Sequence, residues 1–421
     1  MIGIDRDKRR LYRRVWDQVR NRAAINQQPN TSALNDCLNK PRRNRIRVLI
    51  VVTNADLAGA PSHVRDLVMN LRHQVEVAVA FGQSGPIKTA LESEGIRTYL
   101  ITGMQSQISV RTDLAVIQRL LNIVKESQPD FIHAHSAKAG MVARIVGLLH
   151  GTPVLYTVHG WGFGPGRRMT QSVIVWMVEL LLAPFAARYI MVSRADEKAA
   201  RRKLLIRKSR ITVIHNGVPD AGLRADVEAN SGIVMVARVD RSKDHEMALH
   251  AFSKVQTTMR LQLIGSGTDE PTFVTKAMVW AQSAKDRIDF VGESTTVRKH
   301  LAANAVFLLA SKYEGLPLSI IEAMGAGLPV VATNVGGVNE LIDQDCHGYL
   351  IPTGDIDKLS AALQRLVDQG SLRRRLGEAA RERYEACFRL DTMCEQVLAV
   401  YTSMSTRSGM DSRHGGQTVN D

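Results

Sequence analysis

The sequence predicts an α/β protein with two Rossmann-like domains. Short apolar runs rich in β-branched residues alternate with amphipathic segments of helical period. The alternation runs through one half of the chain and then starts again. Runs this apolar are typical of parallel strands that helices cover on both faces. At 421 residues the chain is too long for one ordinary core and suits two.

The first domain is predicted to span residues 46–219. It begins with the strand IRVLIVVT at residues 46–53, and a loop with Gly59 leads into an amphipathic helix at about 63–72. Further predicted strands lie at residues 75–81, 97–101, 131–135, 154–158 and 189–193. Alternating strands and helices of this kind form an open parallel sheet.

The second domain is predicted to span residues 220–389. Its predicted strands lie at 233–237, 261–264, 288–290, 305–310 and 329–333, and its clearest helices at 244–256, 357–368 and 371–384. A last helix at about 390–403 is expected to cross back to the first domain. The tail at 405–421 is polar and rich in Gly and Ser, which predicts disorder.

The amino-acid composition favours a globular protein and disfavours a secreted or nucleic-acid-binding one. Apolar residues make up 45% of the chain and charged residues 23%, as in globular proteins. None of the four cysteines has zinc-type spacing, and the first twenty residues lack an apolar signal region, so a reducing cytoplasmic location is expected. Aromatic residues are only 5%, which disfavours a base-stacking nucleic-acid platform.

Residues 1–45 form a basic arm that carries much of the net charge of +14. Within it, residues 8–22 hold seven Lys or Arg, one Asp, and apolar side chains at helical spacing. This pattern predicts a basic amphipathic helix that binds an anionic membrane surface. A disordered solubilising arm is the alternative. A second apolar segment, residues 172–187, contains Glu179 and Pro184 and is too short to span a membrane, so a buried or interfacial helix is expected.

The stretch EGLPLSIIEAMGAGLPVVAT, residues 314–333, contains the most informative side chains. Glu314 lies in the loop after a predicted buried strand, and Pro317 marks the start of a helix that places Glu322 in its second turn. The free N–H groups at such a helix start suit a diphosphate. The two carboxylates can then accept hydrogen bonds from sugar and ribose hydroxyls.

These residues resemble the E-x7-E motif of the retaining GT-B glycosyltransferases of family 4. The resemblance continues through VARVDRSK (236–243), VIHNGV (213–218), LIGSGTDEP (263–271) and TVHGWGF (157–163), in the family's order. It implies two Rossmann-like domains facing across a cleft, the first for the acceptor and the second for the nucleotide-sugar. The segment HAHSAKAGMVAR (133–144) resembles a subgroup that builds bacterial surface polysaccharides, often from UDP-linked hexoses or N-acetylhexosamines. The alternative for His133, His135 and Lys138 is a strand end followed by a surface helix.

The resemblance also implies roles for particular residues. Arg238 and Lys243 would neutralise the departing diphosphate, which two cations five residues apart at a strand end can do. The implied catalytic residues are His159, Arg238, Lys243 and Glu314. The implied donor-binding residues are Gly59, Arg238, Lys243, Gly315, Leu316 and Glu322.

The chain departs from the family pattern at three positions. Ala58 and Ala237 replace glycines, and His347 stands where Asn is common. The D-x-D triplets at 343–345 and 355–357 resemble a structural loop of the family, whose members generally need no metal. No metal ion or other cofactor is therefore expected.

The sequence thus favours a retaining transferase that moves a sugar from a nucleotide diphosphate to a glycan or lipid-linked acceptor. Two alternatives stay open. One is a sugar-nucleotide epimerase of the same architecture, which would act without an acceptor. The other is an inactive enzyme fold that binds a membrane or nucleic acid through its basic charge.

Overall fold

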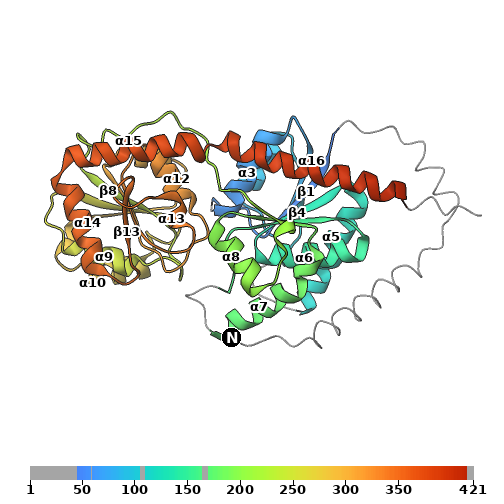
Figure 1. The fold of residues 1–421 in the computed structure, drawn as a ribbon. Coiled ribbons are helices and arrows are strands. Elements are labelled where there is room, and N and C mark those ends of the chain that lie inside the picture. The colour runs from blue at the N-terminus through green and yellow to red at the C-terminus, as the bar shows by residue number, and fades with distance from the viewer. Residues whose placement is uncertain (1–44, 58, 105–109, 164–168, 415–421) are drawn as a thin grey trace, which may run out of the picture. The chain divides into compact units, whose positions relative to one another are not determined.

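The computed structural model describes residues 45–57, 59–104, 110–163 and 169–414 (Figure 1). The predicted basic arm, apart from its last residue, and residues 415–421 lie outside this range. Within it the chain forms two parallel sheets with helices on their faces, and the predicted fold class is confirmed.

The first sheet has seven strands in the order β3-β2-β1-β4-β5-β6-β7, and every neighbouring pair is parallel. The strands are β1 (Arg47–Val52), β2 (Glu76–Phe81), β3 (Arg97–Leu100), β4 (Phe131–His135), β5 (Val154–Val158), β6 (Arg188–Met191) and β7 (Ile211–Val213). The helices between them are α3 (Gly59–Leu71), α4 (Pro86–Ser93), α5 (Val110–Ser127), α6 (Ala137–His150), α7 (Met169–Leu182) and α8 (Arg194–Lys203).

Strand β1 shows why these segments form a buried parallel sheet. Its apolar side chains alternate between two separate cores, Leu49 and Val51 in one, Val48 and Ile50 in the other. Both faces of the strand are thus covered, which the continuous apolar run requires. Because β1 pairs with β2 on one side and β4 on the other, the strand order reverses direction between β1 and β4.

The second sheet has six parallel strands in the order β10-β9-β8-β11-β12-β13. They are β8 (Gly232–Val236), β9 (Arg260–Ile264), β10 (Ile288–Gly292), β11 (Val306–Leu309), β12 (Val330–Thr333) and β13 (Gly348–Ile351). The helices are α9 (His245–Ser253), α10 (Pro271–Ala281), α11 (Val297–Ala302), α12 (Leu318–Gly325), α13 (Val338–Leu341), α14 (Ile356–Asp368) and α15 (Gly370–Cys387). Here the order reverses between β8 and β11.

The last helix, α16 (Leu390–His414), includes the predicted crossing helix at 390–403 and packs against α3 of the first sheet. Met393, Val397 and Tyr401 belong to the same core as β1. The prediction of disorder from residue 405 is wrong for residues 405–414, which continue this helix. Once the anchored turns have nucleated it, each further residue adds a hydrogen bond at little cost, even with Ser and Thr in the sequence.

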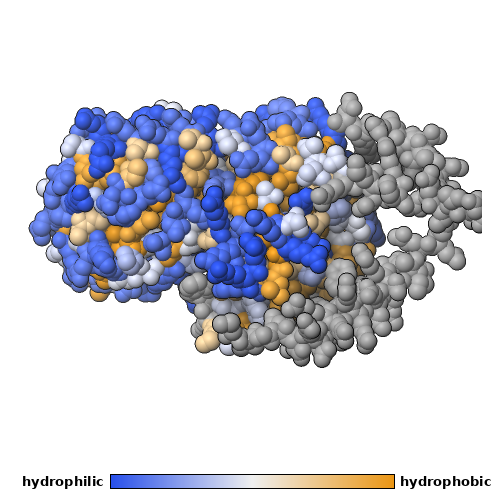
Figure 2. Space-filling view, in the orientation of Figure 1, coloured by the Kyte–Doolittle hydropathy of each residue, from blue (hydrophilic) through white to orange (hydrophobic). Residues whose placement is uncertain are grey.

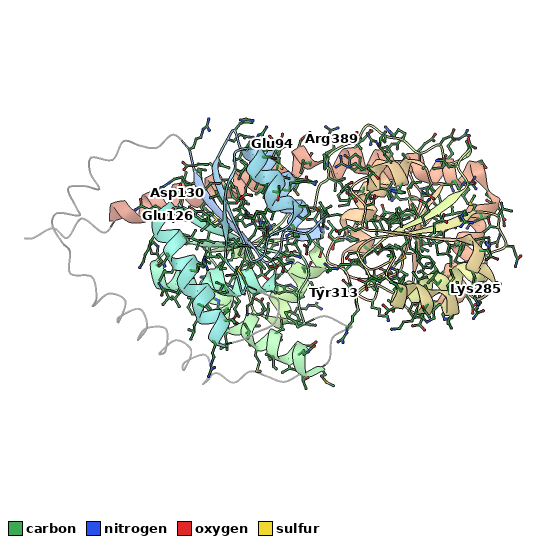
Figure 3. The ribbon with its side chains drawn as sticks, turned by 180° about the vertical axis from the view of Figure 1, so that it is seen from behind. Glu94, Glu126, Asp130, Lys285, Tyr313 and Arg389 are labelled. Atoms are coloured by element: carbon green, nitrogen blue, oxygen red, sulfur yellow. The ribbon has the colours of Figure 1, made fainter. Side chains whose placement is uncertain are left out.

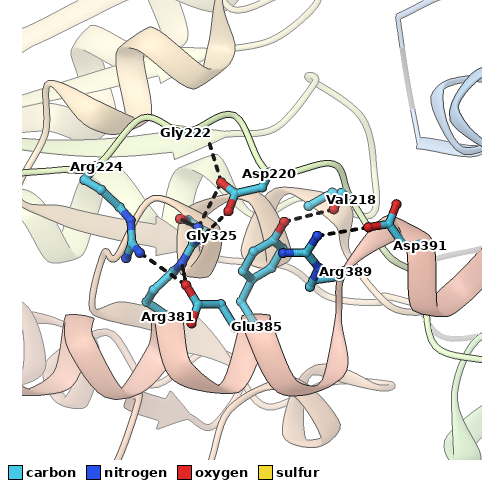
Figure 4. A network of polar contacts seen from close by, with 10 residues as sticks. Val218, Asp220, Gly222, Arg224, Gly325, Arg381, Glu385, Arg389 and Asp391 are labelled. Atoms are coloured by element: carbon cyan, nitrogen blue, oxygen red, sulfur yellow. Dashed lines mark hydrogen bonds and ion pairs between the residues drawn. The ribbon is translucent and has the colours of Figure 1, made fainter.

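Polar contacts fix the segment that joins the two sheets (Figure 4). Arg381 of α15 pairs with Asp220 and donates to the carbonyl oxygen of Gly325, and Arg224 bonds to Glu385 at 3.2 Å. The hydroxyl of Tyr384 donates to the carbonyl oxygen of Val218 at 3.1 Å. The connecting chain is thereby held against α15 immediately before α16 begins.

We expect Arg381→Met to destabilise the protein by about 2–3 kcal/mol, because it removes a mostly buried guanidinium and leaves Asp220 without its partner. The thermal midpoint should fall by about 5–10 °C. Arg374→Met is the control, since Arg374 of the same helix is exposed and pairs with the exposed Glu228. Equal midpoints for the two variants would contradict this assignment.

Candidate active site

The reversal of strand order in the second sheet brings charged residues together. Lys243 follows β8 and Glu314 follows β11, the two strands that flank the reversal, and the backbones of Lys243 and Ser311 form an isolated β-bridge. The Lys243 ammonium donates to the Glu314 carboxylate, and the Ser311 hydroxyl donates to the same oxygen at 2.6 Å. Ligands of open α/β sheets bind at such a reversal, beyond the carboxyl ends of the strands.

Arg238 lies in the same region but has a different partner. Its Nε lies 2.5 Å from a carboxylate oxygen of Asp240, and its side chain is 56% exposed. Asp240 also accepts hydrogen bonds from the hydroxyl and backbone N–H of Ser242. The sequence did not single out Asp240, although an acid between two site cations is a signal for such a positioning pair.

Helix α12 places Glu322 in its second turn, as predicted, and Pro317 is its N-cap. The side chain lines an open pocket of about 300 Å³ together with Asp220, Arg298 and Tyr384. Burial raises the pKa of Glu322 to about 7, and the charge of Arg298 only partly offsets this. The pocket therefore favours the protonated form of this carboxyl group more than water does, and its pKa lies near neutral pH.

The corresponding reversal in the first sheet is occupied by histidines. His135 ends β4, His159 follows β5, and His63 lies on α3 after β1. Nδ1 of His135 lies 3.0 Å from Nε2 of His159. Burial lowers the pKa of all three, in His63 to about 4. The sequence predicted His159 as a site residue but not His63, for which its position in the first helix after β1 was the available signal.

The alternative for His133, His135 and Lys138 is right about the strand end and the following helix but wrong about the surface, because these three side chains are buried. His133 bonds to the hydroxyls of Tyr401 and Thr157, both at 2.7 Å. Lys138 is buried and pairs with Asp113 at 2.6 Å. His133 thereby connects α16 to β5 and stabilises the structure next to the site.

Loops from the two sheets touch at the predicted site. A Cβ added to Gly315 would lie 2.8 Å from the carbonyl oxygen of His159, so only glycine fits. The Tyr313 side chain, labelled in Figure 3, would similarly crowd a side chain at Gly160, whose φ is +103°. The carbonyl oxygen of Leu316 accepts from the Asn216 amide at 2.8 Å. His159 and Glu314 therefore lie in neighbouring loops.

Gly59 begins α3 in an open position, where an added Cβ would meet nothing within 4 Å. The chain itself does not require glycine there, so the predicted approach of a ligand stays a prediction. The four D-x-D carboxylates make contacts within the protein: Asp343 pairs with Arg383, Asp345 lies 4.0 Å from Arg365, Asp355 caps α14, and Asp357 pairs with Lys254.

Comparison with known proteins agrees with this geometry. Residues 227–383 match the glycosyl transferases group 1, and residues 58–217 match the glycosyl transferase 4-like domain. The two matches together cover every strand of both sheets except β1, and all the predicted site residues. The chain is a GT-B glycosyltransferase of family 4.

Two relatives from Escherichia coli illustrate the breadth of this family. The UDP-Gal:α-D-GlcNAc-diphosphoundecaprenol α-1,3-galactosyltransferase is 27% identical over 314 residues, covering 70% of this chain and 81% of that one. The O-antigen biosynthesis glycosyltransferase WbnH is 26% identical over 320 residues, covering 76% and 89%. The Anabaena protein HepE, solved with UDP and glucose, shares the fold with a TM-score of 0.76 at 21% identity, covering 85% of this chain and 100% of that one.

In this glycosyltransferase we expect Glu322→Gln to stabilise the ligand-free protein at pH 8. The pKa of Glu322 is raised from its ordinary 4.5 to about 7, so stability is lost as pH rises between these values. Glutamine does not titrate. The thermal midpoint of the variant should exceed that of the wild type at pH 8, and the difference should vanish towards pH 4.5. Glu378→Gln, at an exposed position of α15, is the control. A difference independent of pH would contradict the burial argument.

Proposed function

We propose that the enzyme transfers a hexose or N-acetylhexosamine from a UDP-linked donor to a lipid-linked or glycan acceptor in surface polysaccharide synthesis. The contact between the Lys243–Glu314 loops and the His159–Gly160 loop carries this proposal. In this contact the backbone of Gly315, next to Glu314, lies against the backbone of His159 and Gly160. The names of the Escherichia coli relatives support the choice of donor and acceptor class.

The proposed reaction is a front-face displacement with retention. The acceptor hydroxyl oxygen bonds to the anomeric carbon while the bond from that carbon to the diphosphate oxygen breaks. The hydroxyl proton passes to the leaving phosphate oxygen. Lys243 and Arg238 neutralise the charge that grows on the diphosphate, which is where preformed charges accelerate a reaction most. With these cations in place we propose that no metal ion is needed.

The test is transfer from a panel of UDP-sugars to undecaprenyl-diphosphate-linked N-acetylglucosamine, in the presence of EDTA. We expect a product only when the acceptor is present, with the anomeric configuration of the donor retained by NMR. Lys243→Ala should lower kcat by about 10²–10³-fold, because it removes a charge that acts mainly in the transition state. Lys254→Ala, an exposed lysine of the same domain, is the control.

Other outcomes of this assay favour the alternatives. Conversion of the donor sugar without an acceptor would indicate an epimerase. Loss of activity in EDTA, restored by Mg²⁺ or Mn²⁺, would overturn metal independence. Full activity in Lys243→Ala would refute the site.

We further propose that the enzyme works at the cytoplasmic surface of an anionic membrane. None of the described helices is long and apolar enough to cross a bilayer. Helix α7 instead exposes apolar side chains, and the surface in its region is partly apolar in Figure 2. The exposed residues are Met169, Val173, Ile174, Met177 and Leu181 of α7, with Leu148 and Leu149 at the end of α6.

Basic residues border this apolar face. The Trp176 indole of α7 donates to the carbonyl oxygen of Lys203 at 3.0 Å, so the end of α8 lies beside α7. That end carries the exposed cations Arg201, Arg202 and Lys203. An apolar face with a basic border matches an anionic lipid surface, where each cation contributes about 1 kcal/mol. No contact with nucleic acid is proposed.

We expect Ile174→Glu with Met177→Glu to reduce co-sedimentation with phosphatidylglycerol vesicles about tenfold or more, because both changes place charge where the lipid would lie. Binding should also weaken with salt. Val279→Glu is the control, since Val279 is an exposed apolar residue on α10 of the second sheet. Unchanged binding in the double variant, lost only when residues 1–45 are deleted, would assign the membrane contact to the arm instead.

A further inference from the structure

Three histidines from separate elements surround one point beside the first sheet. The ring centroids of His63 and His159 lie 4.8 Å apart, those of His63 and His135 5.4 Å, and those of His135 and His159 5.3 Å. One nitrogen from each ring lies within 4.8 Å of the other two. The elements that carry them, α3, β4 and the loop after β5, converge where the strand order reverses.

We propose that His63, His135 and His159 form a binding site for a divalent transition-metal ion of the zinc type. Three imidazoles bound tetrahedrally to one zinc ion hold their ring centroids about 5 Å apart, because each Zn–N bond is about 2.0–2.1 Å and the centroid lies about 1.1 Å beyond. The observed separations already have this size. Only small rotations of the rings are needed to bring the nitrogens to the roughly 3.3 Å spacing of a tetrahedral site.

Unpaired nitrogens are a second, independent indication of a ligand. Among the described residues, Nε2 of His135 is buried without a hydrogen-bond partner. Nδ1 of His63 is also buried without a hydrogen bond of normal geometry, although the Asn216 side chain is close enough to raise the pKa of His63. His63 is 5% exposed and His135 is fully buried. Buried imidazole nitrogens normally find a partner, and each orphan costs free energy. The cluster thus has bonding capacity that the protein alone does not use.

The surroundings hold the cluster in place. The ring of His133 is tilted by 46° against that of His135 with centroids 4.2 Å apart, and both its nitrogens are fixed by hydroxyls of Tyr401 and Thr157. Such a rigid neighbour orients a ligand ring without binding the ion itself. Imidazole ligands select Zn²⁺, Cu²⁺ or Ni²⁺, whereas Mg²⁺ and Ca²⁺ prefer oxygen. Three protein ligands also leave a position open for water.

An ion at this site would inhibit rather than assist. It would occupy His159, whose backbone touches Gly315 of the proposed donor site. Zn²⁺ should therefore block sugar transfer, and EDTA should restore it. This consequence rests on the proposed function, whereas the binding of the ion does not.

The binding test uses the full-length protein, Zn²⁺ and a chromogenic chelator as competitor. We expect one tight site per chain in the wild type and no competition by Mg²⁺. His63→Gln and His135→Gln should each weaken the site by about 100-fold or more, since even the loss of an outer partner costs 10–100-fold. His73→Gln, at an exposed position just after α3, should leave it unchanged.

X-ray absorption of the wild-type complex gives a readout that does not depend on folded variants. Three histidine nitrogens at about 2.0 Å would support the site. A zinc ion bound through cysteine sulfur, or affinity unchanged in both cluster variants, would overturn it. Zinc binding without inhibition of transfer would leave the site intact and count against the proposed role of His159.

Discussion

The reversal of strand order between neighbouring parallel strands is the constraint on which the site depends. At each reversal the loops leave in opposite directions, so the sheet edge stays open to side chains and ligands. The chain uses this twice: the buried histidines lie at the reversal between β1 and β4, and Lys243 and Glu314 follow β8 and β11 at the other reversal. The glycines at 160 and 315 then let the loops of the two sheets touch. Without them the two half-sites would be held apart by side-chain volume.

The polar groups at these two edges are held at a cost to stability. Burial raises the pKa of Glu322, and two imidazole nitrogens are buried without a regular hydrogen bond to any described residue. A core optimised for stability alone would replace such groups by apolar ones. The contacts of Arg381 with the segment that joins the two sheets, together with the apolar cores around both sheets, offset this cost. Unfavourable groups of this kind mark the places where a ligand is expected to complete the bonding.

The strands and the charged motif were accessible from the sequence because both are local signals. An apolar β-branched run such as residues 47–52 is buried as a strand covered on both faces. The spacing of Glu314 and Glu322 places the first in the loop after a strand and the second in the second turn of the next helix. Partners were not accessible, because they are set by tertiary packing. His63 lies beside His159 although the two residues are far apart in the chain, and no local pattern encodes the approach of their elements. Asp240 beside Arg238 is different, because these residues are two apart and the pair could have been predicted from the sequence. The length of α16 was missed for a related reason, since its anchoring core is distant in the chain.

In helix α7, one buried ion pair determines which face of the helix is exposed. Glu179 is the single charged residue of this helix, and in the sequence alone it argued against a membrane span while leaving a buried or interfacial helix open. In the structure its carboxylate lies inside the protein, 2.8 Å from the guanidinium of the fully buried Arg144. Because a carboxylate left there without its partner would be very costly, the pair fixes the rotation of α7. The face turned outward is then free of charge. The same pair that stabilises the interior thus creates the apolar surface proposed to meet the membrane.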